Sequence, residues 1–178
     1  MTQEIRFIPK TELVFHTVPS PKPAKTYMPE WFKTMESFIK NDKKFTPQST
    51  QATFKRCVPV LDSLTSGYIQ ELWCDVYVEQ TLNGPKVTWN VDPAPIKDRS
   101  FEQMTSFPVP GGCSPMPLIW DAQWGMKTPK GYSVLITHPL NRYDLPFTTL
   151  SGIMDTDNCF LSGSIENCWA QCFAFRLK

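Results

Sequence analysis

The sequence lacks the features that define membrane and secreted proteins. Its apolar runs, such as residues 132–136 and 172–175, are far shorter than the ~20 residues that a membrane-spanning helix needs. Residues 1–6 have neither the basic start nor the apolar run of a signal peptide. We therefore expect a protein without a membrane partner that stays in the cytoplasm of the cell that makes it.

The sequence also lacks a strong charge of one sign. Lys and Arg together number 18, Asp and Glu together number 17, and the formal net charge is +1. This balance gives no overall field that would hold a polyanion, so nucleic acid is not favoured as a partner. Two catalytic motifs are missing as well. There is no G-x-S-x-G nucleophile motif, and residues 110–112 lack the lysine of a phosphate-binding loop.

Paired metal ligands are scarce among the cysteines. The six cysteines are Cys57, Cys74, Cys113, Cys159, Cys168 and Cys172. Only the last two lie close together, in a C-x3-C spacing, whereas a structural zinc site usually takes its ligands as two close pairs. Thiols stay reduced in a chain without an export signal. We therefore expect free, buried cysteines and no cofactor.

Apolar residues, by contrast, are abundant. Hydrophobic residues make up 41% of the chain and aromatic residues 13%, while charged residues make up only 20%. This composition favours a folded chain over a disordered one. A length of 178 residues matches one domain of ordinary size. We therefore predict a single globular domain over residues 1–178.

Two helices are predicted in the N-terminal half. Residues 29–40 begin with a proline that suits a first helical turn, and Trp31, Met35 and Phe38 recur at helical spacing. A shorter helix is predicted from Val58 to a left-handed cap at Gly67. The preceding residues 5–18 alternate loosely and predict a strand.

The rest of the chain has the period of two that is typical of strands. Residues 72–79 and 86–91 alternate on either side of Asn83-Gly84, which predicts a hairpin. Further strands are predicted at residues 118–120, 132–137, 147–154 and 164–177. Residues 92–131 otherwise form a long loop region rich in Pro and Gly, and long loops are often functional. The predicted fold class is mainly β: an antiparallel β sandwich, jelly-roll-like, with one or two N-terminal helices packed on it.

Candidate binding residues gather between residues 120 and 157. Trp120 and Trp124 would form an aromatic wall for a flat ligand, or a hydrophobic plug between sheets. Asn141 and Arg142 follow a predicted strand, and Arg142 would grip a carboxylate or phosphate, or pair with Asp144 at the surface.

Asp155 and Asp157 are a second pair of candidates in the same region. Two carboxylates at this spacing suit a divalent cation. They also suit the local hydrogen bonds of a turn, which is the more common use of Asp and Asn at such positions.

The two histidines of the chain suggest a metal alternative. Iron-dependent oxygenases with a jelly-roll fold hold Fe2+ with two histidines and one carboxylate, and here the set would be His16, His138 and Asp155. The usual H-x-D/E spacing is absent, because Pro139 and Leu140 follow His138. The set is therefore an alternative to a binding protein without a metal.

Several short motifs carry a family resemblance over most of the chain. They are Pro23-Ala24-Lys25, Pro29-Glu30-Trp31, Lys55-Arg56-Cys57, Pro59, Asp62, Gly67-Tyr68, Lys127-Thr128-Pro129, Gly131-Tyr132-Ser133, Pro139, Asn141-Arg142, Pro146-Phe147 and residues 152–157. In these the chain resembles an uncharacterised family encoded by tailed phages of marine bacteria and by some bacteria. The family has no established activity, so the resemblance implies only a phage context.

The leading functional prediction combines this context with the missing catalytic motifs. We expect a non-enzymatic binding or assembly protein that acts through an aromatic- and proline-rich loop surface on a virion or host protein. It would lie in the cytoplasm of the host cell or on the virion. A weaker resemblance links residues 152–157 to a uracil-site motif of trimeric dUTPases, but the Arg-Ser-Gly and Gly-rich phosphate motifs of that family are missing.

Overall fold

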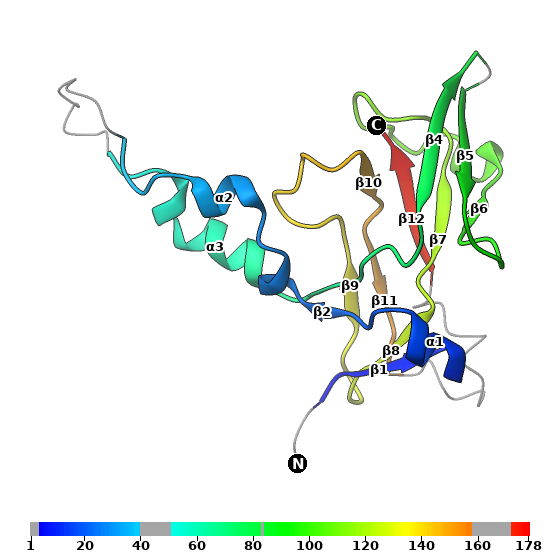
Figure 1. The fold of residues 1–178 in the computed structure, drawn as a ribbon, viewed down its shortest axis with the longest axis horizontal. Coiled ribbons are helices and arrows are strands. Elements are labelled where there is room, and N and C mark those ends of the chain that lie inside the picture. Colours follow the sequence, from blue (N-terminus) through cyan, green and yellow to red (C-terminus); the bar gives the residue numbers. More distant parts are fainter. Residues whose placement is uncertain (1–3, 40–50, 83, 158–171) are drawn as a thin grey trace. The chain divides into compact units, whose positions relative to one another are not determined.

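The computed structural model describes residues 4–39, 51–82, 84–157 and 172–178 (Figure 1). This part of the chain is mostly β, with several small antiparallel sheets and a few short helices. The chain divides into two compact units. The larger unit comprises Met1–Pro21, Gln70–His138 and Asp144–Lys178, and the smaller unit comprises Lys22–Ile69 and Pro139–Tyr143. The expectation of one globular domain stays a prediction.

A four-stranded antiparallel sheet is the largest sheet of the larger unit. Its strands, in spatial order, are β10 (Phe147–Thr149), β12 (Cys172–Leu177), β7 (Leu118–Asp121) and β6 (Ile96–Asp98). β12 pairs with β10 on one side and with β7 on the other. The predicted strand at residues 118–120 is confirmed. Residues 164–171 of the predicted final strand lie outside the described residues.

The predicted hairpin is confirmed. It consists of β4 (Val76–Thr81) and β5 (Gly84–Trp89), paired antiparallel from Val76 opposite Trp89 to Thr81 opposite Gly84. Gly84 has a φ of 105°, a backbone angle that glycine adopts without steric cost. The turn chemistry of the sequence therefore places the hairpin correctly.

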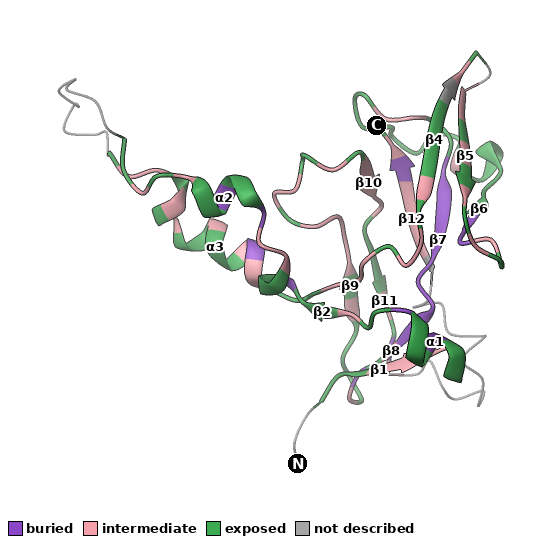
Figure 2. Cartoon of the chain, viewed as in Figure 1, coloured by how far each residue is buried: buried purple, intermediate pink, exposed green. Residues whose placement is uncertain are grey.

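The main core of the larger unit lies between this hairpin and the four-stranded sheet. Its buried residues are Ile96, Leu118, Trp120 and Ala122. Val76, Val87 and Trp89 of the hairpin pack against them, as do alternate residues of β12, namely Phe173, Phe175 and Leu177. Figure 2 shows β7 buried along its whole length. The hairpin thus covers one face of the sheet.

Two further strand pairs lie among the described residues of the larger unit. β1 (Arg6–Pro9) pairs with β8 (Trp124–Lys127), and β9 (Val134–Ile136) pairs with β11 (Gly152–Met154). The single strand predicted over residues 147–154 is therefore two strands, because β10 and β11 have different partners. The strands β6 and β8 lie within the region predicted as a long loop.

The strand predicted over residues 5–18 is wrong in its second half. After β1 the chain forms helix α1 (Glu12–Thr17). The Thr11 side chain accepts a hydrogen bond from the backbone N–H of Val14 at 3.2 Å, which caps the helix. Val14 and Val18 are one helical turn apart, and both are buried beside Trp124. The cap and this burial outweigh the weak alternation of the sequence.

The smaller unit holds helices α2 and α3. Its elements are β2 (Lys22–Pro23), η1 (Ala24–Tyr27), α2 (Glu30–Thr34), η2 (Phe54–Arg56), α3 (Val58–Thr65) and β3 (Tyr68–Ile69). The short predicted helix is confirmed as α3, with proline in its first turn and Gly67 at a φ of 75° after its end. That helices pack on a sandwich stays a prediction.

Helix α2 is shorter than the predicted helix over residues 29–40. Its buried residue is Phe32, whereas Trp31 is 37% and Phe38 53% exposed. The chain leaves the helix after Thr34 because residues 37–39 form backbone hydrogen bonds with residues 51–53. Lys55 Nζ donates to the carbonyls of Phe32 and Lys33, both at 2.7 Å, and so satisfies the open end of the helix.

None of the helices in the described ranges has the length and apolar character needed to cross a bilayer.

Candidate functional site

The two predicted aromatic wall residues lie in the core. Trp120 and Trp124 are each only 5% exposed. The ring of Trp120 lies 5.9 Å from that of Trp73, and Trp124 Nε1 donates to the carbonyl of Val18 at 3.1 Å. Neither indole therefore presents a face to a ligand at the surface, and the alternative of core packing describes both.

Asn141 and Arg142 lie in the smaller unit. Asn141 adopts a φ of 58°, and its Nδ2 donates to Ser63 Oγ on α3 at 2.7 Å. The backbone N–H of Arg142 donates to the carbonyl of Pro139 at 3.1 Å. These bonds shape the 139–143 segment and fasten it to α3. The anion-binding role of Arg142 stays a prediction.

Asp155 and Asp157 accept hydrogen bonds from the segment that precedes β9. Asp155 accepts from Ser133 Oγ and Asp157 accepts from the backbone N–H of Gly131, each at 2.8 Å. Between them Thr156 is fully buried, and its hydroxyl lies 2.7 Å from that of Thr128. The two donors lie 26 and 22 residues away in the sequence, so these are not the local turn bonds that the sequence offered as an alternative to a cation site, and the cation-binding role stays a prediction.

The two histidines of the predicted iron site lie in different surroundings. His16 is exposed near the end of α1, with its ring against Phe15. His138 Nδ1 accepts from the backbone N–H of Thr149 at 3.3 Å, and its ring meets Phe147. Across the described ranges no three His, Cys, Asp or Glu side chains are grouped in a way that could hold a metal ion. The structure therefore does not bring His16, His138 and Asp155 together.

A different set of residues stands out in the predicted loop region. Residues 99–117, which we call the apolar loop, include the short helix η3 (Phe101–Met104) and connect β6 to β7. Four large apolar side chains of this loop are about half exposed: Phe101, Phe107, Val109 and Met116. Apolar side chains that gather on one surface loop mark candidate sites for protein partners.

The apolar loop is fastened to the sheet by one buried arginine. Arg176 on β12 is only 1% exposed, and its Nη1 donates to the backbone carbonyls of Ser114, at 3.2 Å, and Pro115. Its Nη2 lies 3.9 Å from Met104 Sδ. The backbone N–H of Ser114 also donates to the backbone carbonyl of Leu177 at 2.7 Å. The guanidinium therefore contacts the loop at residue 104 as well as at residues 114 and 115.

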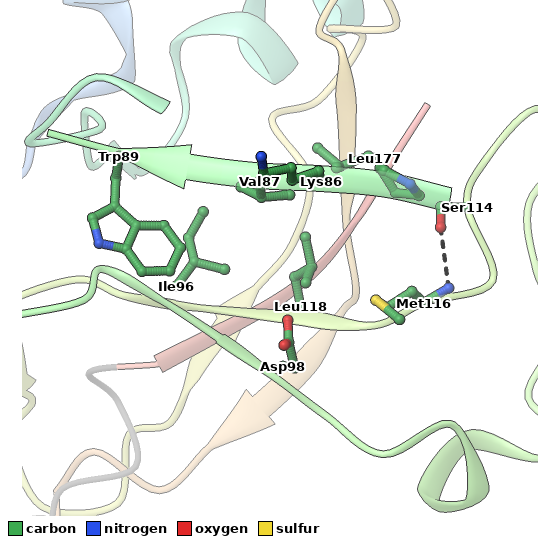
Figure 3. Close-up of a pocket in the computed structure, with 10 residues that line it drawn as sticks. Lys86, Val87, Trp89, Ile96, Asp98, Ser114, Met116, Leu118 and Leu177 are labelled. Carbon is green, nitrogen blue, oxygen red and sulfur yellow. Dashed lines mark hydrogen bonds between the residues drawn. The ribbon is translucent and has the colours of Figure 1, made fainter. Parts of the chain in front are cut away.

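A groove with a volume of about 330 Å³ lies beside this loop (Figure 3). It is lined by β5, β6, β7, the last residues of β12 and the apolar loop. Ile96, Leu118 and Leu177 supply apolar surface. Lys86 and Asp98 are exposed and bring opposite charges to the lining. The groove is at the small end of the range for ligand pockets, so it suits one or two side chains.

Two titratable groups, one just before β4 and one on the apolar loop, have shifted pKa values. Burial raises the pKa of the Cys74 thiol, and the Asp75 carboxylate raises it further. A raised pKa leaves less thiolate, so Cys74 is not an activated nucleophile. On the apolar loop, the hydrogen bond from the Ser100 hydroxyl lowers the pKa of Glu102.

No family model, no curated protein and no solved structure matches this chain. The roles of its residues therefore rest on their geometry.

Arg176 was absent from the residues that the sequence singled out. A signal for it exists, because it alternates with Phe175 and Leu177 and so falls on the small-residue face of the last strand. A charged residue on a face expected beneath a second layer needs a buried partner.

Proposed function

We propose that this chain is a non-enzymatic binding or assembly protein of a phage, and that its apolar loop docks on a virion or host protein. The observation that carries the proposal is the fastened loop with its half-exposed Phe101, Phe107, Val109 and Met116. Burial of these side chains against a partner would remove apolar surface from water, which favours formation of a complex.

The way the loop is held strengthens this proposal. A loop that must become ordered on binding loses conformational entropy, which weakens the complex. Arg176 and Ser114 already hold the apolar loop against β12. Attachment of the loop at residues 104, 114 and 115 therefore limits the conformations of the exposed apolar residues before any partner binds.

For the fold, we propose the finer description of the larger unit as an antiparallel β sandwich. The hairpin of β4 and β5 on one face of the four-stranded sheet supports this proposal, because it makes two layers with a core between them. A jelly-roll order of strands remains an expectation from the sequence.

The proposed function is tested by comparing what the chain and its variants capture from phage-infected cells and from purified virions. The test variant is Phe107→Ser with Val109→Ser. The control is Ile153→Ser, which removes a 77% exposed apolar side chain from β11, away from the loop. We expect a virion or host protein that the unchanged chain and the control retain equally and that the double variant loses. Equal capture by all three would overturn the docking role of the loop.

A further inference from the structure

The outer edge of β5 carries backbone groups that point away from β4. Thr81 and Gly84 enclose a two-residue turn, so they form a hydrogen-bonded pair, and such pairs alternate along an antiparallel ladder. Lys86 and Thr88 therefore direct their backbone groups to β4. Val87 and Trp89 direct theirs to the opposite side. No strand of the described chain pairs with that side of β5.

This outer edge borders the groove. Pro85, Val87 and Trp89 alternate along the edge, and all three line the groove. Pro85 has no N–H, and its position is one where the ladder with β4 needs none. Val87 and Trp89 keep both their donor and their acceptor. An edge of this kind is a template on which another extended chain can pair.

The surroundings of the edge define what could lie there. Ile96, Leu118 and Leu177 offer apolar surface to a side chain that enters the groove, and Lys86 and Asp98 offer one charge of each sign. The available volume of about 330 Å³ has room for side chains but not for a folded element. An extended segment with small or medium apolar side chains fits this description.

We propose that the outer edge of β5 binds an extended segment of a partner protein as an added strand. The backbone of the segment bonds with Val87 and Trp89, and an apolar side chain at one of its alternate positions enters the groove. An acidic residue of the segment lies near Lys86 and a basic one near Asp98. This inference deepens the proposed function and rests on it for the statement that the chain binds a protein.

The proposal is tested by panning the full chain against a displayed library of random twelve-residue peptides. We expect enrichment of peptides that alternate apolar and polar residues and carry an acidic side chain. Peptides from the library are then synthesised with a fluorescent label, and their affinity is measured by anisotropy. Enrichment of helical or non-alternating peptides, or of none, would overturn the proposal.

Two variants separate strand addition from simple apolar contact. Val87→Pro removes the outward N–H but no ladder bond to β4, so we expect at least a tenfold loss of peptide affinity. The control Thr88→Val changes an exposed side chain on the same strand and should stay within twofold. Because Val87 also packs in the core, Lys86→Glu serves as a second test, and panning against it should select basic in place of acidic residues. Unchanged affinity in Val87→Pro, or unchanged selection by Lys86→Glu, would contradict the proposal.

The same materials distinguish this inference from the function on which it rests. If Phe107→Ser with Val109→Ser loses the cellular partner while Val87→Pro keeps it, the loop docks and the edge does not. If sedimentation shows a dimer of the unchanged chain that Val87→Pro dissociates, the occupant is a second copy of this chain, and the proposed partner segment is wrong.

Discussion

The two units of the molecule differ in how they bury apolar residues. In the larger unit the sheet and the hairpin enclose a core around Leu118 and Trp120, and α1 adds Val14 and Val18 beside Trp124. In the described part of the smaller unit the buried hydrophobic side chains are Ala24, Phe32 and Leu64. Hydrogen bonds that cap helix ends, such as those that Lys55 donates at the end of α2, therefore matter more for the stability of the smaller unit. The comparison teaches that similar apolar content yields a core only where strands bring distant residues together.

The units also differ in charge. Nine basic and thirteen acidic residues fall in the larger unit, and nine basic and four acidic residues fall in the smaller one. The net charge of +1 is thus the balance of two unlike parts. The near-zero charge of the whole chain therefore does not disfavour a polyanionic partner for each unit separately.

The largest expected effect lies in the core of the larger unit. Trp120→Ala should lower the free energy of unfolding by about 4 kcal/mol, because it leaves a cavity under the hairpin. Urea denaturation followed by circular dichroism measures the change. Leu135→Ala, at a residue that is 63% exposed, is the matched control and should change stability by about 0.5 kcal/mol or less. A loss below about 1 kcal/mol for Trp120→Ala would contradict the core described for this unit.

A smaller effect is expected where the apolar loop meets the sheet. Arg176→Met should lower the free energy of unfolding by about 3 kcal/mol, since hydrogen bonds to a charged group each contribute about 1.5–3 kcal/mol. It should also speed proteolysis between residues 104 and 115, because the loop loses its attachment. Limited proteolysis with mass spectrometry measures this, and Lys97→Met on β6 is the control. Wild-type protection in Arg176→Met would show that the arginine does not hold the loop.

The smallest effect is expected on the smaller unit. Phe54→Ser should change the free energy of unfolding by about 0.5 kcal/mol or less, because the side chain is 68% exposed. Thermal unfolding at several protein concentrations measures it. A loss above about 2 kcal/mol would mean that Phe54 is covered in solution, and the contrast between the two units would then need revision.

The sequence predicted the elements whose signals are local. The hairpin follows from Asn83-Gly84 between alternating residues, and α3 follows from an early proline and Gly67. The prediction from the sequence failed where contacts between residues distant in the sequence determine the structure. The stripe of Trp31, Met35 and Phe38 suggested a long helix, but pairing of residues 37–39 with residues 51–53 ends α2 early.

The candidate site was predicted only as a region. The sequence marked residues 92–131 as a candidate binding region and offered Trp120 as an aromatic wall or as a hydrophobic plug, and the structure buries Trp120 in the core. The role of Arg176 depends on the pairing of β12 with β7, and the free edge of β5 depends on which strands meet. Neither can be read from neighbouring residues, because both are properties of long-range strand order.

The position of β12 has a consequence for the order in which the chain can fold during synthesis. β12 follows β6, β7 and β10 in the sequence, yet it lies between β10 and β7 in the sheet. While the ribosome is still making the residues before Cys172, these two strands have no common neighbour. The sheet of the larger unit can therefore close only after translation has passed β12, and until then its apolar strands depend on other protection from aggregation.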